Sequence, residues 1–132
     1  MKRLLYSVCL LALTLACESD IFPTGLLYQR WQLERTRQGD APWAVYNLIQ
    51  NDTEYRLDGT LVYRVKGQIV VPCCPPNRFS RDQNEITFVN SDTCPFSLCA
   101  GPTTNKSTIT QLTDDLLELK TGEIISQYRA VK

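Results

Sequence analysis

Residues 53–71, TEYRLDGTLVYRVKGQIVV, decide the fold because they contain three short β-rich runs separated by two turn signals. Aromatic and β-branched side chains fill these runs, and apolar residues tend to recur at alternate positions, as in strands with one buried face. The three predicted strands are Thr53–Leu57, Thr60–Val65 and Gln68–Val71. Asp58-Gly59 and Lys66-Gly67 lie between them, and such pairs favour tight two-residue hairpin turns. The alternation places Tyr55 and Leu57 on one face of the first strand.

The same pattern continues on both sides of this stretch. Further strands are predicted at Gln29–Arg37, Asn77–Asp82, Glu85–Val89, Ser107–Leu112, Leu116–Thr121 and Ile124–Val131. No window carries a 3.6-residue apolar stripe longer than two turns, which argues against a helical bundle. Tight connections join most of the strands. The exception is Gln38–Asp52, which is long enough for a short helix or a lid around Trp43, Tyr46 and Leu48.

An antiparallel sheet of about eight strands must protect its two edges. Closure into a barrel removes the edges and suits strands that follow one another in a simple meander. A two-sheet sandwich is the alternative, but it needs long crossing connections that are scarce in this chain. We therefore predict an all-β protein whose antiparallel meander of about eight strands closes into a barrel.

The composition narrows the classes of function. The chain has 132 residues, with fourteen basic and fourteen acidic side chains and no histidine. This length suits one domain, and the balanced charge argues against a nucleic-acid-binding protein. The lack of histidine removes the commonest general base and the commonest metal ligand. Asp114-Asp115 lies between two predicted strands and fits a turn better than an acid–base pair. We therefore predict no enzyme activity, no catalytic residue, no cofactor and no metal site.

The first sixteen residues have the layout of an export signal. Met1-Lys2-Arg3 is basic, and the apolar run Leu4–Leu15 follows it. A helix over this run is about 18 Å long, well short of the ~30 Å hydrocarbon core of a bilayer. We therefore predict that residues 1–16 form a signal peptide that is removed after export, rather than a membrane-spanning helix.

The segment Leu13-Thr14-Leu15-Ala16-Cys17 resembles the lipobox of bacterial lipoproteins. This resemblance implies a lipid on the sulfur of Cys17, with residues 17–28 as the lipidated N-terminus and tether. Thr14 stands where the family has an aliphatic residue, so ordinary signal cleavage after Ala16 is the alternative. Because Cys9 leaves with the signal, acylation of Cys17 leaves an even number of thiols for disulfides. Two or more acyl chains hold a protein stably at a membrane.

The remaining cysteines are expected to form two disulfides. They are Cys73, Cys74, Cys94 and Cys99. An exported chain meets an oxidising compartment, and neither pair has the Cys-x-x-Cys spacing of zinc sites. A bridge between the adjacent Cys73 and Cys74 is strained, which leaves two connectivities open. Either one ties the connection before Asn77 to the connection after Val89.

With Trp31 on the first strand and Tyr128-Arg129 on the last, the chain resembles a lipocalin-like bacterial lipoprotein. The resemblance implies one barrel domain over residues 29–132. In lipocalins a tryptophan on the first strand packs under an arginine from the last strand, and Trp31 and Arg129 are the matching positions. Gln29 stands where the family has a glycine. The segment Tyr55–Leu61 also resembles a hairpin of small bacterial members.

The resemblance implies one open mouth and an interior suited to a small apolar or amphipathic ligand. The predicted ligand-binding residues are Trp43, Tyr46, Tyr55, Tyr63 and Phe88. Trp43 and Tyr46 are expected at the mouth and the other three inside. An eight-stranded barrel can also be filled by its own side chains. In that case the chain is a non-enzymatic envelope or surface adaptor that binds another protein through its loops. In both cases the lipid is expected to anchor the chain to the bacterial cell envelope.

Overall fold

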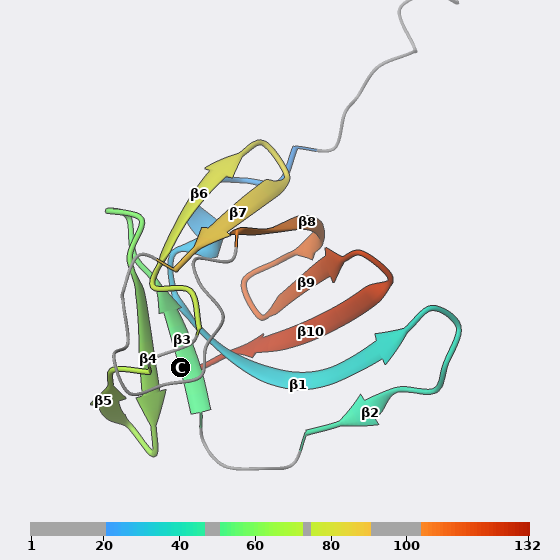
Figure 1. Cartoon of the computed structure of the whole chain (residues 1–132), viewed down its shortest axis with the longest axis horizontal. Helices are drawn as coiled ribbons and strands as arrows, with labels where there is room; N and C mark the ends of the chain where they lie inside the picture. The colour runs from blue at the N-terminus through green and yellow to red at the C-terminus, as the bar shows by residue number, and fades with distance from the viewer. Residues whose placement is uncertain (1–20, 47–50, 73–74, 91–103) are drawn as a thin grey trace, which may run out of the picture.

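The computed structural model describes residues 21–46, 51–72, 75–90 and 104–132 of the chain (Figure 1). Within these residues a single short 3₁₀ helix precedes ten strands. The elements are η1 (Gly25–Leu27), β1 (Arg30–Gln38), β2 (Ala44–Val45), β3 (Asn51–Tyr55), β4 (Leu61–Val65), β5 (Gln68–Val70), β6 (Arg78–Asp82), β7 (Glu85–Val89), β8 (Thr104–Leu112), β9 (Leu116–Thr121) and β10 (Ile124–Ala130). The predicted all-β class is confirmed.

The strands form one curved antiparallel sheet, as Figure 1 shows. Its order is β5-β4-β3-β1-β10-β9-β8-β7-β6, and β2 pairs with β1 beside this path. Most neighbours in this order are also consecutive along the chain. The exceptions are β3 and β1, which are separated by β2, and β1 and β10, the first and last strands. The predicted meander is therefore confirmed.

The sheet is not closed into a continuous barrel, which corrects our prediction. Its two end strands, β5 and β6, do not pair with each other. The two ends of the sheet meet at an isolated bridge between Thr60 and Arg78, beside hydrogen bonds from Leu61 N to Asn77 O (2.9 Å) and from Phe79 N to Gly59 O (2.8 Å). The reason is that β5 folds back on β4 and pairs with its residues Tyr63–Val65. β5 therefore occupies the edge of β4 with which β6 would have to pair to close the barrel.

One of the two turns predicted within residues 53–71 is confirmed. Lys66 and Gly67 have φ angles of 50° and 79°, as a tight two-residue hairpin turn requires. The other turn is longer, because Arg56 N donates to Thr60 O (3.0 Å) around a three-residue loop. Leu57 lies in that loop and is 82% exposed, so it does not share the face of Tyr55. Gly59 ends the loop at φ 79°, and a Cβ there would lie 2.8 Å from the carbonyl oxygen of Phe79.

The described part of the first long connection holds β2 and no helix. Ala44 and Val45 pair with Thr36 and Arg35 of β1. The one described helix, η1, comes before β1 rather than after it. Leu48 lies outside the described residues.

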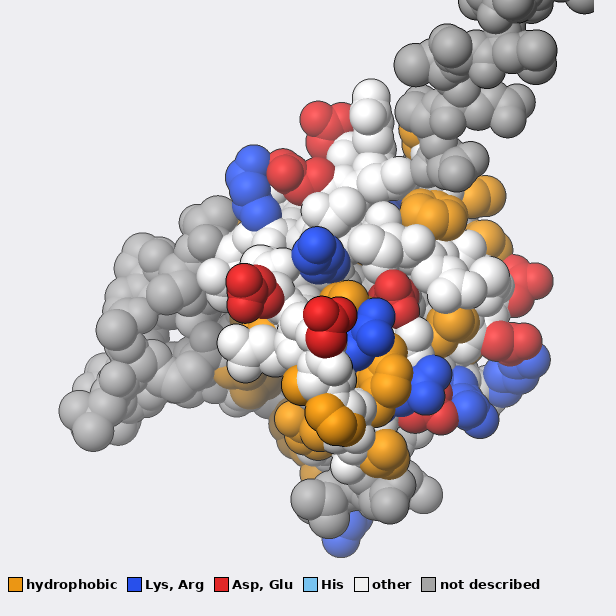
Figure 2. All heavy atoms as spheres, turned by 90° about the vertical axis from the view of Figure 1, so that its right-hand side faces the viewer, with side chains coloured by type: hydrophobic (Ala, Val, Ile, Leu, Met, Phe, Trp, Pro, Cys, Tyr) orange, Lys and Arg blue, Asp and Glu red, His pale blue; other side chains and the backbone are white. Residues whose placement is uncertain are grey.

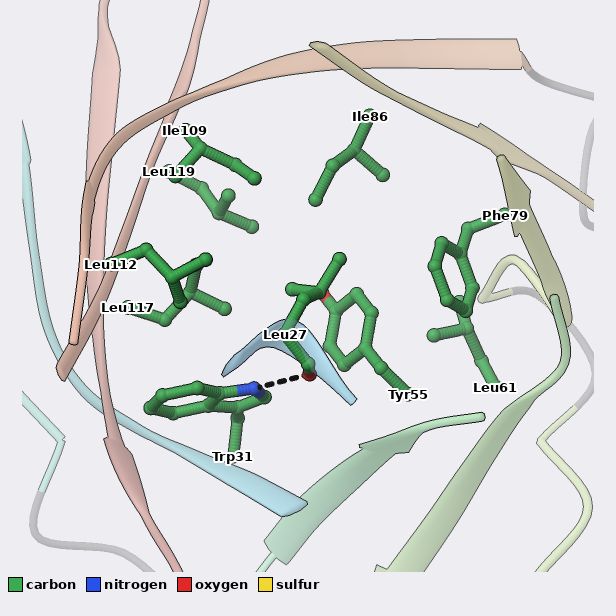
Figure 3. Close-up of a cluster of buried hydrophobic side chains, with 10 residues drawn as sticks. All are labelled: Leu27, Trp31, Tyr55, Leu61, Phe79, Ile86, Ile109, Leu112, Leu117 and Leu119. Atoms are coloured by element: carbon green, nitrogen blue, oxygen red, sulfur yellow. Dashed lines mark hydrogen bonds between the residues drawn. The ribbon is translucent and has the colours of Figure 1, made fainter. Parts of the chain in front are cut away.

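The core lies where η1 meets the inner faces of the strands (Figure 3). Its buried members are Leu27, Trp31, Tyr55, Leu61, Phe79, Ile86, Ile109, Leu112, Leu117 and Leu119. The indole Nε1 of Trp31 donates to the carbonyl oxygen of Leu27 (3.0 Å), which fixes η1 under the sheet. Large aliphatic and aromatic side chains therefore fill this end of the curved sheet, which we call the core end.

The segment before η1 is also held at the core end. The backbone nitrogen of Phe22 donates to Asn84 Oδ1 (3.1 Å) at the turn between β6 and β7. Arg81 donates to the carbonyl oxygens of Phe22 (2.6 Å) and Pro23 (3.2 Å). The chain from residue 22 onward is therefore attached to the body of the protein.

Candidate functional site

Beyond the core, the inner faces of the strands border a partly open cavity of about 240 Å³, which we call the inner cavity. Its lining residues are Thr53, Tyr55, Leu61, Tyr63, Pro76, Phe88, Asn105, Ser107, Leu119, Thr121 and Tyr128. Three of these, Thr53, Tyr63 and Tyr128, also line a neighbouring hollow of about 330 Å³, which we call the rim hollow. The two spaces adjoin on the inner side of β3, β4 and β10.

The cavity exists because small side chains replace large ones away from the core end. On β8, Ile109 belongs to the core, whereas Ser107, the inward-facing residue two positions before it, lines the cavity. Ser107 Oγ and Thr121 Oγ lie 2.6 Å apart and share a hydrogen bond. Thr53 takes the matching inner position on β3, next to Tyr55. These short hydroxyl side chains leave space that the aliphatic core residues fill elsewhere.

Aromatic rings form much of the cavity wall. The ring of Tyr55 meets those of Phe79 and Phe88 edge-on, with centroids 5.0 and 6.2 Å apart. Tyr63 donates its hydroxyl to the carbonyl oxygen of Pro76 (2.5 Å), which ties the connection before β6 to β4. The wall is therefore rigid on the side of β3, β4 and β7.

Burial keeps the phenols of the cavity uncharged. It raises the pKa of Tyr63 to about 12. Burial also raises the pKa of Tyr128, and it raises that of Tyr55 well above its usual value. At neutral pH these side chains therefore offer neutral hydroxyl groups that can donate and accept hydrogen bonds.

The charged side chains of β3 and β4 alternate with the cavity residues and are engaged with one another. Asp52 is 6% exposed and accepts hydrogen bonds from Arg30 Nε (2.9 Å) and Nη2 (2.6 Å). Arg64 Nη1 lies 3.7 Å from Asp52 Oδ1, and Arg64 also pairs with Glu54. The hydrogen bond from Arg64 lowers the pKa of Glu54. This network stabilises the sheet outside the cavity.

The structure brings together three of the five predicted ligand-binding residues. Tyr55, Tyr63 and Phe88 line the inner cavity. Trp43 does not, because it directly precedes β2, which pairs with β1. There the guanidinium carbons of Arg35 and Arg37 lie 4.6 and 4.7 Å from the centre of its ring. Tyr46 follows β2 and is 48% exposed. Neither residue lines the inner cavity or the rim hollow.

The predicted pairing of Trp31 with Arg129 is not found. Trp31 is buried in the core, but its register partner on β10 is Ala130. Arg129 therefore points to the opposite face of the sheet, where it binds Glu34 (2.6 Å) with its side chain 70% exposed. Leu27, rather than an arginine, covers the indole of Trp31.

Other predicted sites fall outside the described residues, namely Cys17, Cys73, Cys74, Cys94 and Cys99. The described part of the chain contains no group of three or more acidic or sulfur side chains placed to hold a metal ion. None of its helical residues forms a segment long and apolar enough to cross a membrane.

Several cavity residues were missed from the sequence. Tyr128 alternates with Gln127 and Arg129 on β10 and so faces inward with Ala130, a pattern that was visible in the sequence. Thr53, Ser107 and Thr121 have no such signal. Ser107 and Thr121 lie next to each other on β8 and β9, whereas Thr53 lines the cavity from β3.

A larger hollow of about 680 Å³ lies on the outer side of the sheet. Its lining residues are Glu34, Arg35, Gln111, Asp115, Leu116, Gln127, Arg129, Ala130 and Lys132. Most of its charges are paired, because Arg129 binds Glu34 (2.6 Å) and Lys132 binds Asp115 (2.9 Å). Figure 2 shows acidic and basic side chains interspersed on one face of the molecule, with no large region of one sign. We therefore take the inner cavity as the candidate site.

No family model matches the sequence, and no curated protein matches it. The structure is similar to the crystal structure of a lipocalin-like protein from Bacteroides uniformis ATCC 8492. The two share 19% sequence identity, and the match covers 80% of this chain and 98% of the other with a TM-score of 0.44. At this degree of similarity neither a ligand nor a role transfers to this chain.

Proposed function

We propose that the protein is a non-enzymatic, lipid-anchored binding protein of the bacterial cell envelope that holds a small molecule in its inner cavity. The observation that carries the binding role is the cavity itself, about 240 Å³ lined by side chains from six strands and by Pro76. Small-molecule sites are typically concave and mostly apolar, with a few polar groups that orient the ligand. Tyr55, Phe88 and Leu61 supply the apolar wall, and the hydroxyl side chains supply the polar groups.

The anchor is supported by the position of the N-terminal segment. Arg81 and Asn84 hold Phe22 and Pro23 at the core end. Cys17 precedes Ile21 by four residues, which span at most about 14 Å when extended. A lipid on Cys17 therefore keeps the core end close to the bilayer and leaves the cavity on the far side of the core.

The anchor is tested by growing the producing bacterium with labelled palmitate. The wild-type chain is expected to carry the label and to sediment with membranes. Cys17→Ser is expected to lose both properties. A labelled Cys17→Ser variant, or an unlabelled wild type, would contradict the proposed lipid anchor and would leave the proposed binding role unaffected.

The binding role is tested by displacement of a hydrophobic fluorescent probe from the purified full chain. We expect saturable binding of one probe per chain in the wild type. Thr53→Trp fills the space that the inner cavity and the rim hollow share, so it is expected to weaken binding at least tenfold. Thr108→Trp is the matched control, because Thr108 is an exposed position next to Ser107 on β8, and it is expected to bind like the wild type.

Both variants have the same N-terminus, so the difference between them reports the cavity alone. Circular dichroism checks that both variants fold, since an added ring in a packed interior typically costs about 1–3 kcal/mol. Equal probe binding by the wild type and Thr53→Trp would contradict the binding role. An adaptor that contacts another protein through its surface would then remain.

A further inference from the structure

We propose that the inner cavity selects small uncharged aromatic molecules with a hydroxyl or amide group, and rejects carboxylates such as fatty acids. This inference rests on the proposed binding role and names the class of ligand. It follows from the charge, the shape and the hydrogen-bonding groups of the wall.

The wall offers no positive charge to a bound anion. None of the described residues that line the inner cavity is charged. In the adjoining rim hollow Arg64 pairs with Glu54, while its Nη1 lies 3.7 Å from Asp52 and makes no hydrogen bond to the described residues, so only the inner cavity lacks a positive charge. In the inner cavity a carboxylate would exchange part of its hydration for neutral donors alone, with no opposite charge to balance its own, which is unfavourable.

The shape and chemistry of the wall suit an aromatic ring. Tyr55, Tyr63, Phe88 and Tyr128 surround the cavity on strands β3, β4, β7 and β10. Aromatic pairs prefer edge-on or offset contacts, which add to the gain from burial. Tyr55 already makes edge-on contacts with Phe79 and Phe88. A flat guest can extend this arrangement, whereas a long flexible chain gains less from it.

The hydrogen-bonding groups of the wall are neutral and short. Thr53 and Thr121 carry hydroxyl groups, and Asn105 carries an amide that both donates and accepts. A guest with one hydroxyl or amide group can form a hydrogen bond with them, while a purely apolar guest gains no hydrogen bond from the wall. The volume of about 240 Å³ is also smaller than the ~300–1,000 Å³ of drug-sized sites. Two fused rings are therefore a suitable probe size.

The test compares four probes by calorimetry on the purified full chain at pH 7: 2-naphthol, naphthalene, 2-naphthoate and dodecanoate. We expect 2-naphthol to bind at least tenfold more tightly than either carboxylate, and several-fold more tightly than naphthalene. Thr53→Val keeps the shape of the side chain and removes its hydroxyl. This variant is expected to weaken 2-naphthol several-fold and to leave naphthalene unchanged.

Thr53→Trp serves as the blocked reference for every probe, so that binding by the N-terminal segment is subtracted. If 2-naphthoate or dodecanoate binds at this site as tightly as 2-naphthol, the ligand class is wrong while the binding role stands. If no probe distinguishes the wild type from Thr53→Trp, both the ligand class and the binding role are wrong. Should Thr53→Val fail to fold, the ranking of the four probes on the wild type still decides the inference.

Discussion

Replacing Trp31 by alanine is expected to lower the free energy of unfolding by about 3–5 kcal/mol, the usual loss for a large aromatic side chain removed from a core. Trp31 is 1% exposed at the centre of the core end. The change leaves a cavity and removes the hydrogen bond from the indole to Leu27 O. The helix η1 then loses its attachment to the sheet. Urea denaturation followed by circular dichroism measures the effect.

Trp43→Ala is the matched control for this prediction. Trp43 is partly exposed and packs between Arg35 and Arg37 beside β1. Its removal is expected to cost about 1 kcal/mol, because exposed cation–π contacts are worth about 0.5–1 kcal/mol each. Equal losses in the two variants would show that Trp31 is not the centre of the core.

Asp52→Asn is expected to lower the free energy of unfolding by about 2–4 kcal/mol, measured in the same way. Asp52 is buried and receives two hydrogen bonds from Arg30, with Arg64 close by. The substitution keeps the shape of the side chain but removes the charge that balances these arginines. The cost arises at the buried end of the pair, because the change weakens two hydrogen bonds between charged groups, while Arg30 is 37% exposed and Arg64 keeps Glu54. The loss should shrink only in part in high salt, since Asp52 is buried but Arg30 is partly exposed to screening ions.

Glu85→Gln is the control for Asp52→Asn. Glu85 pairs with Lys106 at 2.6 Å, but both side chains are largely exposed. Surface pairs of this kind contribute about 0–1 kcal/mol. A loss for Asp52→Asn no larger than that for Glu85→Gln would contradict the structural role of the network around Asp52.

The strands that could be predicted best are those with turn residues at both ends. Glu85–Val89 and Leu116–Thr121 were predicted with the bounds that β7 and β9 have. Both runs alternate over most of their length, and local turn chemistry fixes where they begin and end. Local signals of this kind do not depend on which strands pair.

The features that could not be predicted depend on pairing between distant strands. A register shift in β1 between Leu33 and Arg35 inserts one residue opposite β10. Such a shift changes which side chains face the interior. The back-folding of β5 onto β4, which leaves the sheet open, depends equally on a choice of partner. The prediction for Arg129 was wrong for a related reason. Ala130 pairs with Trp31, so the neighbouring Arg129 points to the opposite face of the sheet.

The candidate site was predicted in part. Alternation along single strands correctly pointed Tyr55, Tyr63 and Phe88 into the cavity. The empty space itself arises where Ser107 meets Thr121 across two strands, and no single strand carries that information. Trp43 and Tyr46 were expected at the mouth, but the pairing of β2 with β1 was not visible in their sequence.

The most direct test of the binding cavity is a nuclear magnetic resonance titration of the isotope-labelled full chain with 2-naphthol. Binding in the inner cavity is expected to cause saturable shifts of the aromatic signals of Tyr63, Phe88 and Tyr128, with the indole N–H signal of Trp31 unchanged at the core end. Shifts confined to the side-chain signals of Gln111 and Gln127 in the outer hollow, or no saturable shift at all, would contradict it.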